Sequence, residues 1–184
     1  MIDNKEIEII RKKFQRLVLE NRIKNPKIHK KEFFLKKAFS SIQLAKKLVN
    51  ENEYLDWVIN VSYYSMFYNA VALLAYIDVD LGDIDESVHI LTYQAIVYYF
   101  FILNKKIEEQ YIDDFKKEME QADKRIKNLA RQRSNEIISS FKNARKKRAE
   151  ITYELGKTAE IKSAQTSLRR AESFDILVNR IMID

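Results

Sequence analysis

Basic side chains are concentrated in one window in the second half of this 184-residue chain. Between residues 121 and 150, ten Lys and Arg residues outnumber three acidic ones, so the window has a net charge of +7, against +6 for the whole chain. The ten are Lys124, Arg125, Lys127, Arg131, Arg133, Lys142, Arg145, Lys146, Lys147 and Arg148. Like charges at i,i+4 destabilise an isolated helix, and the guanidinium fork of arginine suits phosphate. The window therefore indicates contact with RNA, a nucleotide or an acidic protein face, with a merely solvated helix face as the alternative.

Other residue types limit the chemistry that one chain can perform. Cysteine is absent and the only histidines are His29 and His89, which argues against a thiolate site, a disulfide or a multi-histidine metal site. Gly82 and Gly156 stand alone, so there is no glycine-rich phosphate loop. We therefore expect no metal and no cofactor. We interpret His89, in the apolar helix start SVHILTY, as a partly buried structural residue.

Four aromatic residues lie close together in one very apolar segment. They are Tyr63, Tyr64, Phe67 and Tyr68. Buried tyrosine hydroxyls usually find a hydrogen-bond partner, so we interpret the group as core packing and helix contacts. The alternative is a stacking platform for nucleic-acid bases.

The elements that must position these residues are helices. Two glycines, one proline (Pro26) and 33% charged residues leave little material for the turns of a sheet protein. Apolar residues recur at helical spacing in six segments. These segments are 5–20, 31–50, 54–78, 87–103, about 107–153, and about 158 to the C-terminus. They predict an all-α, antiparallel up-and-down bundle of four to five core helices, with residues 1–28 as an N-terminal helical extension and 29–184 as the bundle.

Several finer features of these helices can be predicted. Apolar groups cover nearly the whole circumference of 54–78, which should therefore be the central helix. Asp85 or Ser87 is a candidate cap for the fourth helix and Thr158 for the last one. A break near Ser134 would interrupt the long fifth helix, and Gly156 would end the segment that follows.

Nothing in the chain predicts export or membrane insertion. The N-terminus is charged from the start, unlike a secretory signal. The most apolar stretch, Tyr93 to Leu103, is far shorter than the ~20 residues that cross a bilayer. Together with the missing cysteines, this favours a cytoplasmic protein without a membrane segment.

Two motifs follow one another in residues 34–74. Their residues are Leu35, Lys37, Ala38, Ala45, Leu48, Tyr63, Tyr64, Met66, Phe67, Ala70, Leu73 and Leu74. They resemble the first half of HEPN domains, in which a helix of the form xLxKAxxxLxxAxxLL precedes, after a short gap, a helix with an AYYAMFxAAxALL-like signature. The resemblance extends loosely over about residues 30–180. Ser87-Val88-His89 resembles a Lys-His-Ser-like helix start without its lysine. Arg148 and Tyr153 keep the spacing of an R-x-x-A-D-Y-like element, but Ile151-Thr152 replaces its Ala-Asp pair.

The resemblance implies both a fold and a choice of activities. Many HEPN proteins are metal-independent RNases whose R-x(4–6)-H motif lies at a dimer interface, where the Arg and His assist attack by the ribose 2′-hydroxyl. Others bind nucleotides or nucleic acids without catalysis. Many are encoded beside a minimal nucleotidyltransferase as a toxin–antitoxin pair. A homodimer and a nucleotidyltransferase partner are therefore implied here, in addition to RNA or a nucleotide.

The family's catalytic histidine has no counterpart, because no histidine follows residue 89. Tyr153 has a reference pKa near ~10 and is a poor base at pH 7. Our first hypothesis is therefore binding of nucleotide or RNA phosphate through Arg145, Lys146, Lys147, Arg148, Arg131 and Arg133. The second is a divergent HEPN RNase that uses Arg148 and Tyr153, with His89 as a substitute base. The third is a scaffold that binds only another protein.

Overall fold

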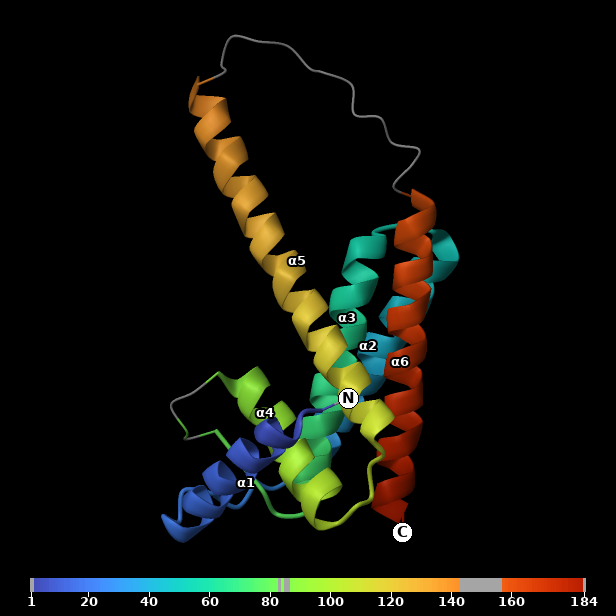
Figure 1. The fold of residues 1–184 in the computed structure, drawn as a ribbon. Coiled ribbons are helices and arrows are strands. Elements are labelled where there is room, and N and C mark those ends of the chain that lie inside the picture. The colour runs from blue at the N-terminus through green and yellow to red at the C-terminus, as the bar shows by residue number, and fades with distance from the viewer. Residues whose placement is uncertain (1, 83, 85–86, 143–156, 184) are drawn as a thin grey trace.

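The computed structural model of the chain describes residues 2–82, 84, 87–142 and 157–183, with the backbone alone for 128–142 and 157–160. Within these residues the chain is helical and has no strand, which confirms the predicted all-α bundle. Figure 1 shows the arrangement. The elements are α1 (Asn4–Leu19), α2 (Lys30–Glu51), α3 (Leu55–Tyr76), α4 (Val88–Ile96), the π-helical segment η1 (Val97–Leu103), α5 (Glu109–Lys142) and α6 (Lys157–Ile183).

Helix α3 is the centre of the bundle, as its apolar circumference predicts. It packs against α2, α6, α5 and α4, and buried residues occur on all of its faces. Among the described residues, α3 is also the one helix long and apolar enough to cross a membrane, but 78% of its most apolar window is buried inside the bundle. That burial is what the core helix of a bundle requires.

Helices α2 and α3 form an antiparallel hairpin. The helical spacing of apolar residues predicted for 31–50 is confirmed on α2, because Ala38, Ile42 and Ala45 are buried. The small side chains of Ala38 and Ala45 allow the two helices to lie close, and the buried Ser65 hydroxyl donates a 3.0 Å hydrogen bond to the carbonyl of Ala38. The hairpin turn contains two residues in the left-handed region, Asn52 (φ 54°) and Tyr54 (φ 47°). Asn52 ends α2 by donating its N–H to the last carbonyls.

Helix α1 packs on the core of its own chain. Ile10, Phe14 and Leu17 are buried, and the Phe14 ring stacks on Tyr98 of η1 with ring centroids 5.2 Å apart. The apolar face of α1 therefore belongs to the same hydrophobic core as buried residues of α3, α4 and α6.

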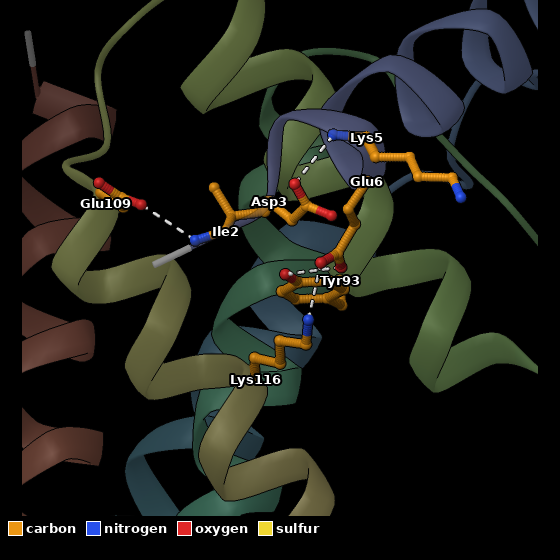
Figure 2. A network of polar contacts seen from close by, with 7 residues as sticks. All are labelled: Ile2, Asp3, Lys5, Glu6, Tyr93, Glu109 and Lys116. Carbon is orange, nitrogen blue, oxygen red and sulfur yellow. Dashed lines mark hydrogen bonds and ion pairs between the residues drawn. The ribbon is translucent and has the colours of Figure 1, made fainter.

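A polar network fastens the beginning of α1 to α4 and α5, as Figure 2 shows. Glu6 accepts hydrogen bonds from Lys116 Nζ at 2.7 Å and from the Tyr93 hydroxyl at 3.3 Å. The N–H of Ile2 donates to Glu109 at 2.9 Å. The Lys5 N–H donates to Asp3, which caps α1.

The predicted helix 87–103 changes its winding part-way. It is an α-helix to Ile96 and a π-helix over Val97–Leu103. Ser87 occupies the N-cap position, as predicted, although its side chain makes no capping hydrogen bond. Asp85, the other candidate cap, lies outside the described residues.

Helices α5 and α6 are long and converge at only one end. Phe115 and Phe174 meet there with ring centroids 5.3 Å apart. Arg170 bridges Asp114 and Glu118 across the same contact. Toward its C-terminal end, α5 leans away from α6 and leaves the bundle (Figure 1).

Two predictions about the ends and continuity of these helices are wrong. Helix α5 continues through Ser134 without the predicted break, because its helical backbone hydrogen bonding is unbroken to Lys142. Helix α6 already includes Lys157, so Thr158 lies inside its first turn instead of capping it. Gly156, the predicted stop, lies outside the described residues.

Candidate functional site

The predicted phosphate site falls largely outside the residues that the structure describes. The residues outside are Arg145, Lys146, Lys147, Arg148 and Tyr153. Arg131 and Arg133 lie on α5, in the part for which only the backbone is described.

The first part of the basic window is described in full. Arg125 forms an ion pair with Asp56 of α3, and Lys127 pairs with Asp123 one turn earlier on α5. The side chain of Lys124 is exposed. Acidic residues of this chain therefore partly balance the beginning of the window. Beyond Lys127, Glu136 and Glu150 are the only acidic residues in the window.

A pocket of about 370 Å³ opens beside this first part of the window. It lies between α3, the start of α4 and the middle of α5. Its aromatic and polar lining from α3 and α4 is Tyr63, Tyr64, Ser87 and His89. From α5 it receives Glu120, Asp123 and Lys127, and its apolar walls are Ile90, Met119, Ala122 and Ile126. Its volume is within the range of small-molecule sites, and its lining combines apolar walls with a few polar groups, as such sites do.

Tyr63 and His89 are joined by a hydrogen bond in the pocket wall. The Tyr63 hydroxyl lies 2.7 Å from His89 Nδ1, a hydrogen bond in which either group can be the donor, depending on the imidazole tautomer. The His89 ring packs on Phe67 at 4.4 Å and on Tyr63 and Tyr64 at 5.6 and 5.9 Å. This aromatic surround fixes the ring plane of His89.

Burial in this aromatic surround shifts the pKa values of both groups. It lowers the pKa of His89, so its imidazole is neutral at pH 7. Burial is also the main cause that raises the pKa of Tyr63, with smaller contributions from Tyr64 and Asp123. Tyr63 therefore keeps its proton at pH 7, and the pair consists of two neutral groups that can each donate and accept.

Glu120 is the free carboxylate of the pocket. Asp123 is engaged by Lys127, whereas Glu120 forms no hydrogen bond or ion pair within the described part of the chain. Tyr64 is half-buried, so part of its ring is open to the pocket. The site can therefore offer a ring face and an unpaired carboxylate to the same ligand.

The sequence analysis considered some of the residues that line this pocket, but it did not predict that they lie together. Tyr63 and Phe67 are buried, which confirms the interpretation of the aromatic group as core packing for these two residues. His89 is partly buried, as predicted. Glu120 and Asp123 were not candidates. The available signal was that they directly follow the apolar positions Met119 and Ala122 at i,i+3 spacing, which places them at the rim of the buried face of α5.

Comparison of this chain with protein-family models, curated proteins and solved structures finds no match. In the described residues, no group of three or more His, Asp or Glu side chains is close enough to hold a metal ion.

Proposed function

We propose that this chain is a HEPN-type protein that binds nucleotide or RNA phosphate through the basic window, residues 121–150, which begins on α5. The observation that carries the proposal is that the C-terminal end of α5, which carries the middle of this window, leaves the bundle. A helix end that projects from a bundle can be approached by a long polyanion. Neutralising phosphate charges releases counterions, and that release dominates affinity for nucleic acids.

The arrangement of the neighbouring acids supports the same proposal. In the part of the window whose side chains are described, Arg125 pairs with Asp56 of α3 and Lys127 pairs with Asp123 of the window itself. The dense run Arg145–Arg148 has only Glu150 close behind it in the sequence. Repulsion among these charges on one segment favours an external anion as the balancing partner.

The residues that carry the HEPN resemblance occupy consistent positions, which supports the family part of the proposal. Ala38 and Ala45 of α2 face α3, and Met66, Ala70 and Leu73 of α3 are fully buried. By analogy with the family, we propose a cytoplasmic homodimer that acts beside a minimal nucleotidyltransferase as one half of a toxin–antitoxin pair.

The test is RNA binding as a function of salt. For the wild-type protein, we expect the logarithm of the association constant to fall linearly and steeply with the logarithm of salt concentration. Arg145→Ala with Arg148→Ala should weaken binding at least tenfold at low salt. The same double variant should reduce the slope by about 2, because each arginine that is removed leaves roughly one phosphate charge without its cation. The matched control removes two exposed charges from α1, with Lys12→Ala and Arg16→Ala. Equal effects of both double variants would contradict a specific role for the window.

A divergent metal-independent RNase is the second candidate, and the neutral imidazole of His89 favours it. A base with a lowered pKa is unprotonated at pH 7 and can accept the proton of a ribose 2′-hydroxyl. Cleavage of RNA in the presence of a chelator, abolished by His89→Gln and by Arg148→Ala, would establish it. If the protein neither binds nor cleaves RNA and a second protein copurifies with it, the scaffold hypothesis replaces both.

A further inference from the structure

The pocket between α3, α4 and α5 adjoins the proposed phosphate-binding surface. Lys127 lines the pocket, and Arg131 follows it by four residues, which is about 6 Å along the helix axis. A nucleotide whose phosphate contacts the basic part of α5 can therefore extend toward the pocket. This adjacency raises the question of which part of such a ligand the pocket would hold.

The polarity of the pocket excludes the phosphate itself. Two carboxylates, Glu120 and Asp123, line it against one cation, Lys127, and Asp123 already engages that cation. An anionic group inside would meet the unpaired Glu120. The part of the ligand that fits the pocket is uncharged or positively charged, and it has N–H groups that can donate hydrogen bonds to a carboxylate.

The shape and walls of the pocket suit a flat, uncharged ring. Tyr64 exposes part of its ring there, and Ile90, Met119 and Ile126 provide apolar surface. Bases stack on aromatic side chains because every base has a π-face, and this stacking is a main source of affinity for single-stranded nucleic acids. At about 370 Å³ the pocket is large enough for one base with its sugar.

We propose that this pocket binds one nucleobase, which stacks on Tyr64 and donates N–H hydrogen bonds to Glu120. The inference rests on the proposed function, because it takes the phosphate of the ligand to lie on the basic window. It adds the base, which the basic window does not recognise. A carboxylate accepts two parallel hydrogen bonds best from adjacent donors, which guanine provides through its N1–H and its 2-amino group. Adenine and cytosine offer an amino group beside an acceptor, and uracil offers a single ring N–H.

The Tyr63–His89 pair has a positioning role in this proposal. Its 2.7 Å hydrogen bond keeps the His89 ring in contact with Tyr64, and so limits the movement of the Tyr64 ring. The two groups are neutral at pH 7 and add no charge that would compete with Glu120 for the base.

The experiment measures binding of the four uncharged ribonucleosides, a short single-stranded RNA and the four nucleoside monophosphates to the full chain. Nucleosides have no phosphate, so they test the pocket independently of the basic window. We expect guanosine to bind best and uridine worst, with the same order among the monophosphates. If the preference for guanine over the other bases appears only when the base is part of the RNA, the ligand is a strand. If the monophosphates show the same preference as the RNA, the ligand is a free nucleotide.

Two variants and their matched controls test the two contacts. Tyr64→Leu should weaken guanosine binding roughly tenfold or more, and Tyr64→Phe should retain it because the ring remains. Glu120→Gln should abolish the order among the bases while leaving the fold intact. Tyr76→Leu, at the C-terminal end of α3, and Glu108→Gln, at an exposed position just before α5, should behave as the wild type.

The outcomes separate this inference from the proposed function. If nucleosides bind with this order but RNA binding shows no salt dependence, the pocket binds a base and the basic window does not bind phosphate. If RNA binds with a steep salt dependence while Tyr64→Leu and Glu120→Gln match the wild type, the pocket inference is wrong and the phosphate surface stands. Binding of choline that depends on Tyr64, with no binding of any nucleoside, would also overturn the inference, because the pocket would then be a cage for organic cations.

Discussion

His89 on α4 and Tyr63 on α3, 26 residues apart in the sequence, share a 2.7 Å hydrogen bond inside an aromatic cluster. The bond joins the start of α4 to the central helix and forms one wall of the pocket. Because both groups are neutral at pH 7, protonation of the imidazole is the event that would disturb this wall.

The pKa of His89, which burial lowers, predicts how stability depends on pH. The unfolded chain binds the His89 proton near the reference pKa of about 6.5, whereas the folded chain binds it only at lower pH. The contribution of neutral His89 is therefore complete above about pH 6.5 and is lost as the pH falls toward the folded-state pKa. Urea unfolding at a series of pH values should show this loss for the wild type and a smaller one for His89→Gln. Identical pH profiles would show that His89 does not titrate as burial requires.

Phe14 tests whether α1 belongs to the cooperative core. Its ring is fully buried and stacks on Tyr98, so Phe14→Ala should lower the free energy of unfolding by about 3–5 kcal/mol. Leu19→Ala, at an 85% exposed position on the same helix, should change it by less than about 0.5 kcal/mol. Both values come from urea unfolding followed by circular dichroism. Equal, small effects would mean that α1 unfolds separately from the bundle.

Arg170 holds a buried charge in place between α5 and α6. Its guanidinium forms an ion pair with Asp114 at 3.1 Å and donates a hydrogen bond to Glu118 at 2.7 Å, and the Glu118 side chain is 0% exposed. Arg170→Met would leave the Glu118 carboxylate buried without its partner, at a cost of about 3–5 kcal/mol of unfolding free energy. The neighbouring exposed Arg169 provides the control, since Arg169→Met should be nearly neutral. A decrease below about 1 kcal/mol for Arg170→Met would show that Glu118 is protonated or solvated in the folded chain.

Asp56 tests whether acids of this chain compete with an external phosphate for the basic window. It pairs with Arg125, and both side chains are partly exposed, so the ion pair contributes at most about 1 kcal/mol to stability. Asp56→Asn frees Arg125 and should tighten RNA binding, with a salt slope steeper by up to about 1. The control is Glu53→Gln, an exposed charge just before α3. Unchanged or weaker RNA binding by Asp56→Asn, relative to that control, would exclude Arg125 from the phosphate surface.

The sequence alone determined the helical class and the central position of α3. Helix formation and periodicity are local properties, and a chain with two glycines and one proline has few places to turn. The winding of η1 escaped prediction because every residue of Val97–Leu103 is apolar or aromatic, so a shift of register carries no signature in the pattern. The predicted break at Ser134 failed because a single polar residue is a weak signal within a long helix.

Only the tertiary structure decided which side chains meet. Tyr63, His89 and Glu120 come from three helices, and Glu6 and Lys116 lie 110 residues apart, so no local pattern could bring them together. Such contacts depend on the angles at which helices pack, and these angles follow from side-chain shapes along whole interfaces. The excess of positive charge near the end of α5 was evident from the sequence. That the end of α5 leaves the bundle was visible only in the tertiary structure.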